Sequence, residues 1–519
     1  MRMGHAIAVV LVLVAALVAG CGGGGKAVGT SDKAGKTASA VGDTLNLAVA
    51  RPPNSLNPAF TNTSWAWYVH LAYDPLIIWG PDGKPKPSLA TSWRYVGNGN
   101  KTFELTLRPN VKFSDGSALT AKVVKDNLDY QKQAGGPYQP FVAGKTITAT
   151  GPLTVRITTK LPDPEIVREL SQDLMAGNMI SPKGLANPKG LGTTTAGAGP
   201  YVLQPEATVP GDHYTYTPNP NYWNKAAIHY RKVVVKALPN PNSVLNALKT
   251  GQVDAAIGDY TTAATAESAG LQVKSAPFVF LGLNLMDRKG KIVPALGDVR
   301  VRQALNYAVD RKTISQALLG KFGTPTEQTV VPGQDGALTE PVYTYDPAKA
   351  KQLLAQAGYA KGLTIPVLTT TYSSQDQVTQ AIAGDLEKVG VKLKIKVEAN
   401  VDKYTSDMIA AKYPAASMGI GALPIYIESP LMFFPTAAVF NPFKAADAKV
   451  QSLWAQAAAA DPGQREALDQ QLERRIVELG WFVPVMLSPK FYYARTNVTG
   501  IAPTVDQPKP NPVWFQPAE

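Results

Sequence analysis

Residues 377–397 join a helical pattern to a strand pattern with no loop between them, and this junction indicates the fold class. Apolar residues recur at helical spacing up to residue 389, Gly390 ends that pattern, and residues 391–397 alternate apolar residues with lysines. A spacing of three to four residues is typical of a helix that covers a core, and strict alternation is typical of a strand. A helix that stops at a glycine and leads straight into a strand is typical of a sheet with crossover helices. The sequence therefore predicts an α/β fold.

The same two patterns predict further elements along the chain. Strands are expected at residues 44–49, 101–107, 154–158 and 481–487. Helices are expected after Thr120, whose side chain suits an N-cap, and at residues 164–175, 301–308, 348–357, 447–460 and 463–479. No repeat of fixed period is visible, which disfavours a solenoid.

The first residues have the pattern of an export signal. A short charged stub precedes residues 6–19, which are uncharged and apolar and end in small residues. This run is too short to span a bilayer comfortably, so residues 1–20 are predicted to be a signal peptide. No later uncharged run approaches the length of a membrane-spanning helix.

Cys21 follows this run and is the single cysteine of the chain. The segment Leu17-Val18-Ala19-Gly20-Cys21 resembles the bacterial lipobox, in which the thiol takes a diacylglycerol group and the chain is cut just before it. A lone cysteine excludes an internal disulfide and a CxxC zinc site. Residues 21–42 consist mostly of Gly, Ala, Ser, Thr and Lys, which indicates a flexible tether after the lipidated Cys21. The expected localisation is extracytoplasmic, anchored to the outer face of the cell membrane.

Length and charge limit the remaining possibilities. Without leader and tether about 480 residues remain, which is too many for one core and suits two or three lobes. The formal net charge is +12, but lysines and arginines are scattered singly, so no nucleic-acid partner is expected.

The chain lacks the sequence patterns of common enzymes and metal sites. It contains no HExxH, GxSxG or SxxK pattern, and only four histidines. We therefore expect no catalytic residue, no metal ligand and no cofactor. An alternative of another class is a lipoprotein enzyme or a surface sensor on the same fold, which hydrolysis of a candidate solute would indicate.

Short phrases over nearly the whole chain resemble one protein family. They are SLNP at 55–58, LAYDPL at 71–76, PSLATSW at 87–93, VKFSDG at 111–116, LTA at 119–121, GPY at 199–201, NPNYW at 219–223, VRVRQAL at 299–305, AVDR at 308–311, YDPAKA at 345–350 and AGY at 357–359. These phrases, in this order, resemble the bacterial extracellular solute-binding proteins of family 5, the lipoproteins that serve oligopeptide, dipeptide and nickel ABC importers.

The resemblance implies a type II periplasmic-binding-protein-like fold, with two α/β lobes and an additional inserted domain. The implied boundaries are lobe I at 43–76, 196–290 and 489–519, the inserted domain II at 77–195, and lobe III, the second α/β lobe, at 291–488. It also implies that a solute is held in the cleft between the lobes and is passed unchanged to ABC permease and ATPase subunits. The protein is expected to act as a monomer.

The resemblance also places the ligand site. In peptide-binding members a motif Trp-x-x-Asp-Tyr-x-x-Pro supplies an aspartate that pairs with the peptide's amino group. The matching segment is residues 423–430, with Leu423 at the tryptophan position and Tyr426 at the aspartate position. Glu428 could receive the amino group instead, since a buried unpaired ammonium group costs several kcal/mol, as an order of magnitude. The predicted solute is therefore peptide-like.

Aromatic residues leave a second ligand open. Asn62, Ser64 and Trp65 fall in the loop that meets the ligand from the first lobe of family members, and Tyr138 falls in the second lobe. Tyr426 with Trp65, Trp67 and Tyr138 could stack on an oligosaccharide or another uncharged solute. A nickel chelate is disfavoured because the chain has few histidines.

Overall fold

A computed structural model describes residues 41–61, 63–421 and 423–519. The predicted signal peptide, most of the tether with Cys21, and Asn62 lie outside the described residues. Residues Ala40–Glu519 form one compact unit. Within the described part of the chain, no helix combines the length and the apolar character needed to cross a bilayer.

One large mixed sheet runs through two groups of elements. The strands of the first group, which we call lobe I, are β1 (Gly42–Val49), β8 (Tyr201–Leu203), β9 (His213–Pro218), β10 (Tyr230–Ala237) and β11 (Ala255–Gly258). The strands of the second group, lobe III, are β13 (Thr324–Pro325), β14 (Leu363–Thr369), β15 (Val391–Val397) and β16 (Ala415–Gly421). Between them lie β12 (Gln272–Leu285) and β17 (Phe482–Ala494). The strand order is β15-β14-β16-β12-β17-β11-β1-β10-β9-β8, with β13 paired to β17.

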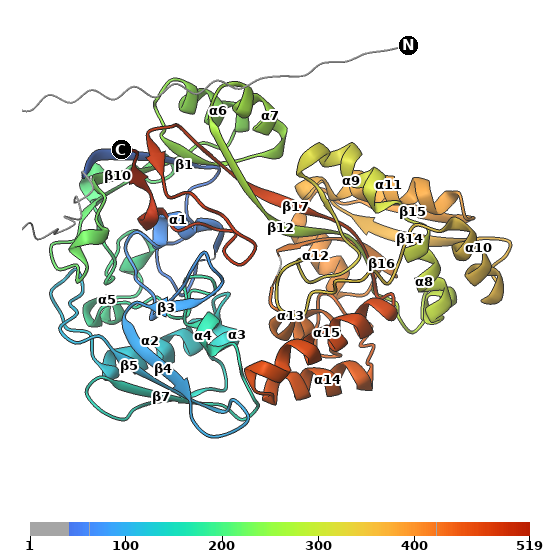
Figure 1. The fold of residues 1–519 in the computed structure, drawn as a ribbon, viewed down its shortest axis with the longest axis horizontal. Coiled ribbons are helices and arrows are strands. Elements are labelled where there is room, and N and C mark those ends of the chain that lie inside the picture. Colours follow the sequence, from blue (N-terminus) through green and yellow to red (C-terminus); the bar gives the residue numbers. More distant parts are fainter. Residues whose placement is uncertain (1–40, 62, 422) are drawn as a thin grey trace, which may run out of the picture. The chain divides into compact units, whose positions relative to one another are not determined.

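The long strands β12 and β17 belong to both lobes. They pair antiparallel along their length, and Figure 1 shows them running side by side from one lobe to the other. The register shifts between Pro277 and Val279, so Phe278 is left out of the ladder. Pro277 lies opposite Pro489, and neither proline has a backbone N–H to donate. The ladder is therefore interrupted where the two lobes meet, which suits a hinge.

Lobe I is organised around β1. This strand pairs in parallel with β10 and β11, and its alternating residues Leu45, Leu47 and Val49 are buried as predicted. The helices α6 (Pro241–Lys249) and α7 (Tyr260–Ser268) pack on Ala48 and on β11. The N-terminal and C-terminal segments join the same core through α1 (Ala66–Val69), β18 (Val498–Thr499) and β19 (Gln516–Pro517).

Lobe III confirms the α/β prediction. Its helices are α8 (Val299–Tyr307), α9 (Arg311–Leu319), α10 (Pro347–Gln356), α11 (Gln375–Glu387), α12 (Val401–Ile409), α13 (Ile425–Met432), α14 (Ala448–Ala459) and α15 (Pro462–Glu478). After α11 the chain turns at Gly390, which has a φ of 85°, and enters β15, which pairs in parallel with β14. Glycine adopts this backbone conformation without steric cost.

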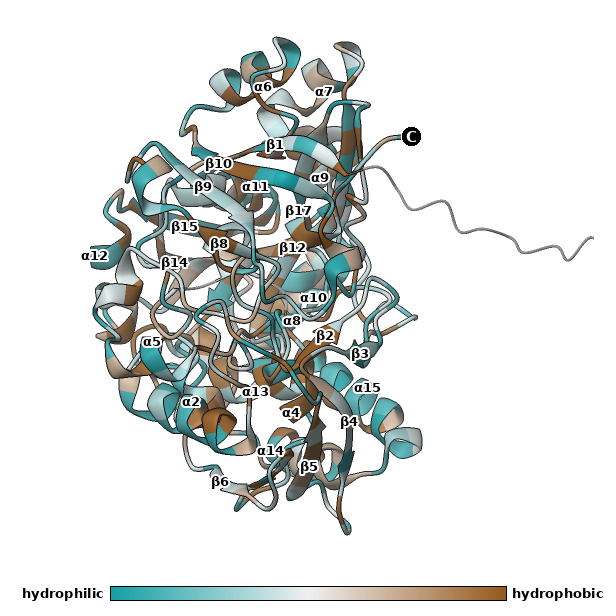
Figure 2. Ribbon diagram, turned by 90° about the vertical axis from the view of Figure 1, so that its left-hand side faces the viewer, coloured by the Kyte–Doolittle hydropathy of each residue, from teal (hydrophilic) through white to brown (hydrophobic). Residues whose placement is uncertain are grey.

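A separate four-stranded sheet forms the centre of a third group, which we call domain II. Its strands are β4 (Ala90–Tyr95), β5 (Thr102–Leu107), β7 (Thr154–Thr158) and β6 (Thr146–Ala149), paired in that order. Its helices are α2 (Ala121–Ala134), α3 (Gln139–Val142), α4 (Ile166–Glu169) and α5 (Pro182–Ala186), and a hairpin of β2 (Ile77–Trp79) and β3 (Pro85–Pro87) precedes β4. The Thr120 side chain caps α2 by accepting from the N–H of Val123, as predicted. Figure 2 shows brown and teal patches on α2, which match its buried and exposed sides.

The helix predicted at residues 164–175 is wrong. Only α4 is helical, and Met175 has a φ of 57°. The chain folds back instead: the N–H groups of Leu76 and Ile77 donate to the carbonyls of Gly177 and Leu170. Long-range backbone hydrogen bonds to the segment around β2 thus replace those of a longer helix.

The other predicted helices and strands are confirmed, except that β17 continues seven residues beyond Leu487 because it also pairs with β11. The domain boundaries derived from the family resemblance stay a prediction.

Candidate functional site

Two adjoining cavities lie between lobe III and the surface formed by lobe I and domain II. The first, which we call the lysine cavity, has a volume of about 60 Å³. It is lined by Arg168, Asp173, Leu174, Pro277, Phe278, Gln334, Leu423, Pro424, Val505, Asp506, Pro508 and Lys509. The second, the acidic cavity, has a volume of about 540 Å³ and shares Arg168, Gln334, Pro424 and Asp506 with the first. The two cavities therefore form one cleft.

Carboxylates outnumber cations in the acidic cavity. Its wall contains five carboxylates and three cations, namely Asp82, Glu165, Asp335, Asp469 and Asp506 against Lys84, Arg168 and Arg465. Burial is the main cause that raises the pKa of Asp469 to about 6, and Arg465 opposes this shift. This part of the cleft therefore suits a positively charged group.

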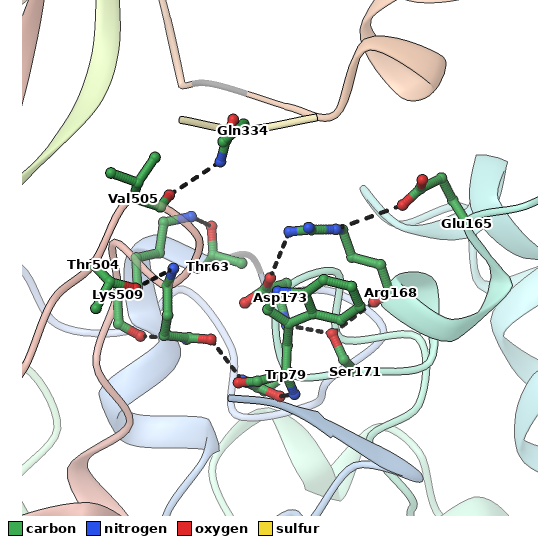
Figure 3. Close-up of polar contacts among 12 residues, drawn as sticks. Thr63, Trp79, Glu165, Arg168, Ser171, Asp173, Gln334, Thr504, Val505 and Lys509 are labelled. Carbon is green, nitrogen blue, oxygen red and sulfur yellow. Dashed lines mark hydrogen bonds and ion pairs between the residues drawn. The ribbon is translucent and has the colours of Figure 1, made fainter. Parts of the chain in front are cut away.

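Arg168 is the residue that separates the two cavities. Its Nη1 donates to Asp173 Oδ2 over 3.2 Å, and its guanidinium carbon lies 4.0 Å from the centre of the Trp79 ring. Its Nε lies 3.5 Å from Glu165 Oε2. In Figure 3, Asp173 lies next to Arg168, and the amide of Gln334 points toward Val505. Charge pairing and stacking together hold the guanidinium in place.

Phe278 lies where the cleft meets the hinge. Because it is left out of the β12–β17 ladder, its side chain is available to the lysine cavity. The ring also packs against lobe III, since a Cβ on Gly421 would lie 2.9 Å from the ring atom Cζ. Lys509 Nζ lies 4.6 Å from the ring centre. The hinge and the lysine cavity therefore share this side chain.

Contacts across the cleft hold the lobes together in this structure. Arg465 of α15 forms an ion pair with Glu165 at the start of α4. Gln334 donates to the carbonyl of Val505 over 3.0 Å, and Tyr426 donates to the carbonyl of Pro162 over 2.7 Å. The Asn100 amide donates to the last carbonyls of the α14 region. The structure thus represents a closed arrangement of lobe III on domain II and lobe I.

Four of the predicted residues, namely Ser64, Trp65, Trp67 and Tyr138, are not among the residues that line either cavity. Ser64 and Trp65 belong to a short 3₁₀ helix, Thr63–Trp65, and the Trp65 indole donates to the Pro52 carbonyl over 2.7 Å. Trp67 is buried in the lobe I core and donates to the Pro510 carbonyl. Tyr138 is buried too, and its hydroxyl accepts from the N–H of Thr63. Their contact with ligand stays a prediction.

The three predicted residues at 423–428 occupy three different environments. Leu423 lines the lysine cavity. Tyr426 stacks on Trp454 with ring centres 5.0 Å apart, and it lines a separate, largely apolar cavity of about 350 Å³. Glu428 is 1% exposed inside lobe III, where Glu473 is the neighbouring acid. In this closed structure Glu428 therefore faces the lobe III interior.

The sequence did not lead us to predict several residues that line the cleft, namely Arg168, Asp173, Phe278, Gln334 and Lys509. Lys490 adjoins them, with its Nζ 5.5 Å from the centre of the Phe278 ring. A signal for Lys490 was present, because Ser488-Pro489-Lys490 interrupts an apolar strand. Arg168 and Asp173 carried no such signal, since their position depends on the chain reversal after α4.

Comparison with known proteins places this chain in a family. The model "Bacterial extracellular solute-binding proteins, family 5 Middle" matches residues 84–438. The chain belongs to family 5 of these proteins. The Glutathione-binding protein GsiB of Salmonella paratyphi A is 28% identical to it over 360 residues, which cover 67% of this chain and 68% of GsiB.

Solved structures share the fold of this family 5 protein. The ABC transporter substrate-binding protein CtaP of Listeria monocytogenes has a TM-score of 0.78 at 20% identity, covering 92% of this chain and 100% of CtaP. The periplasmic binding protein DppA of Helicobacter pylori, in complex with the peptide STSA, has a TM-score of 0.74 at 21% identity, covering 92% and 99%. The type II periplasmic-binding-protein fold predicted from the sequence is confirmed.

Family membership fixes the general role. Family 5 proteins are extracellular or periplasmic receptors that work with ABC permease and ATPase subunits, and they are transport proteins rather than enzymes. Within the described residues no group of three or more His, Cys, Asp or Glu side chains is placed to hold a metal ion.

Proposed function

We propose that this family 5 receptor is a lipid-anchored protein that captures a peptide-like solute and passes it to its importer. One observation carries the proposal: the acidic cavity and the lysine cavity adjoin within a single closed cleft. A short peptide carries an ammonium group and a carboxylate, so it can complement both parts. Two similar proteins support a peptide-like solute: GsiB is named as a glutathione-binding protein, and the DppA structure contains the peptide STSA.

Capture needs no chemical step. With lobe III apart from the other elements, the solute enters a hydrated cleft; on closure, water leaves and the polar contacts gain strength. The hinge at Pro277 and Pro489 gives lobe III freedom to move, and the Arg465–Glu165 pair stabilises the closed form.

An uncharged oligosaccharide fits the cleft less well. The rings predicted to stack on it are engaged elsewhere, because Tyr426 lies on Trp454 and Trp67 is buried in the lobe I core. An uncharged solute would also leave the excess carboxylates of the acidic cavity without a counter-charge while removing them from water. The charged lining therefore favours the peptide-like solute.

A thermal-shift screen tests the receptor proposal. The mature protein in detergent is heated with a random tripeptide library, with an oligosaccharide mixture, or alone. A ligand that binds the folded state at about 100 times its Kd stabilises it by about 2.7 kcal/mol, so we expect the peptide library to raise the melting temperature by a few degrees. A rise with oligosaccharides alone, or with neither mixture, contradicts a peptide-like solute.

The lipid anchor is tested separately through Cys21. We expect the wild-type chain, expressed in bacteria fed a radiolabelled fatty acid, to carry the label and to sediment with membranes. Cys21→Ser is expected to lose all label and to leave the membrane fraction, because no other thiol exists in the chain. Label on the Cys21→Ser protein contradicts acylation at this residue.

A further inference from the structure

Two partly buried lysines meet beside one aromatic ring at the hinge. Lys490 of β17 and Lys509 of the C-terminal segment place their ammonium nitrogens 5.5 Å and 4.6 Å from the centre of the Phe278 ring. Both lysines lie on the lobe I side of the register shift. Cation–π contacts compensate part of the lost hydration of each ammonium group. They do not neutralise its charge.

The acids around these lysines are too few to balance them. Lys509 donates to Thr63 Oγ1, and Asp173 is the carboxylate that acts on it. Asp173 is already paired with Arg168. Among the described residues the side chain of Lys490 forms no hydrogen bond and no ion pair, and its ammonium group has only the Phe278 ring beside it. Asp173 and Asp506 are the carboxylates that line the lysine cavity with Arg168 and Lys509, and Arg168 is also paired with Glu165. Lys490 lies beside this group without an acid partner of its own among the described residues.

The pKa values of both lysines lie below their usual range. Burial lowers the pKa of Lys490 to about 8. Burial, and then repulsion from Lys490, lower the pKa of Lys509 to about 7, while Asp173 acts in the opposite direction. The ammonium group of Lys509 is therefore destabilised both by burial and by the neighbouring charge of Lys490.

A carboxylate between the lysines would remove this imbalance. We propose that Lys490 and Lys509 bind a carboxylate group of the solute. This inference rests on the proposed receptor function and names the solute class more closely: a short peptide or amino-acid conjugate with a free carboxylate. Its carboxylate lies at the lysines and its ammonium group in the acidic cavity, on the other side of Arg168.

The position of the lysines also sets the order of events. Both come from the lobe I side, whereas Gln334, Leu423 and Pro424 of lobe III cover the lysine cavity. The carboxylate site therefore exists before the lobes close. The solute docks by its carboxylate first, and lobe III then encloses it.

Lys490→Met tests this role against a structural one. The substitution removes an ammonium group that no acid balances, so we expect the melting temperature of the empty protein at pH 7 to rise by a few degrees. We expect binding of the tripeptide library to weaken at least about tenfold, since one charge-assisted hydrogen bond is lost. Lys274→Met, at an exposed position of β12, is the matched control and should change neither quantity. A lower melting temperature with unchanged peptide binding identifies Lys490 as a structural residue and overturns the proposal.

A second measurement does not depend on the identity of the solute. The protein with ¹³C-labelled lysine is titrated with acetate and, in parallel, with acetamide, and the Lys490 and Lys509 signals are assigned from the methionine variants. We expect acetate to shift both signals in a saturable way and acetamide to leave them unchanged. Equal responses to acetate and acetamide overturn the carboxylate site.

The outcomes separate the two proposals. If acetate binds at the lysines but no peptide raises the melting temperature, the carboxylate site stands and the peptide receptor proposal fails. If a library of tripeptide C-terminal amides binds as tightly as the free acids, the receptor proposal stands and the carboxylate site fails.

Discussion

Glu428→Gln is expected to raise the free energy of unfolding by about 3–5 kcal/mol at pH 8, as an order of magnitude. Glu428 is 1% exposed, and its Oε1 has no hydrogen-bond partner among the described residues. Burial, and then Glu473, raise the pKa of Glu428 to about 8. Burial also raises the pKa of Glu473 to about 7, although its carboxylate accepts from the N–H of Thr329 over 2.7 Å. The folded protein therefore prefers these carboxyl groups protonated.

The sign of the pH dependence follows from these shifts. A carboxyl group with a raised pKa in the folded state contributes stability that is complete below its unfolded pKa of about 4.5 and is lost as the pH rises through its folded pKa. Urea unfolding of the wild type between pH 5 and pH 8 should show a steady fall in stability. Glu428→Gln should flatten this fall, because glutamine keeps the volume without the charge.

Glu340→Gln, at an exposed position, is the matched control and should follow the wild type at every pH. A Glu428→Gln variant that is less stable than the wild type at pH 8 would contradict the prediction. It would mean that a group not in contact with Glu428 in this structure stabilises its carboxylate. The same variant tests the prediction that Glu428 replaces the missing family aspartate. Unchanged peptide affinity in Glu428→Gln contradicts that prediction.

Arg465→Met is expected to weaken solute binding by about a hundredfold or more, since breaking a buried ion pair costs about 3–5 kcal/mol. The closed structure places Arg465 between Glu165 of domain II and Asp469 of its own helix. Without Arg465, closure would bury Glu165 and Asp469 next to each other, with Arg168 beside Glu165 but no cation of the described residues paired with Asp469. When the lobes are apart, water still solvates Glu165. Removing Arg465 therefore destabilises mainly the closed form of the protein.

Calorimetric titration with the tripeptide library measures the affinity change. Arg474→Met, on the exposed side of the same helix, controls for the loss of a positive charge and should bind as the wild type does. The melting temperature of the empty Arg465→Met protein separates closure from folding. A large fall in that temperature with unchanged affinity contradicts the assignment of the pair to closure.

The local spacing of apolar residues predicted most helices and strands, because the secondary structure of these segments depends mainly on their own residues. The connection from α11 through Gly390 to β15 depends on the spacing of apolar residues and on one glycine. Both features can be recognised in the sequence. The structure of the segment after α4 could not be predicted in this way, because hydrogen bonds to residues distant in the sequence end that helix. Propensity is a weak guide wherever such tertiary contacts compete.

The candidate site was less predictable than the fold. Leu423 was placed on the cleft by its position in the family motif, and it lines the lysine cavity. Lys509 carried no local signal, because a lysine's neighbours in space do not appear in its local sequence. For Lys490 the signal was the interruption of an apolar strand, which does not show what lies beside the lysine. Tyr426 looked available for a ligand, and only the structure shows that Trp454 and Pro162 engage it.

The central claim is that two lobes close on a solute, and a distance across the cleft tests it most directly. Spin labels at Thr150→Cys in domain II and Gln456→Cys on α14 occupy exposed positions on opposite sides. Pulsed electron resonance should show longer, broader distances in the empty protein and one short distance once the tripeptide library is bound. An identical distance distribution in the empty and the solute-bound protein would contradict closure.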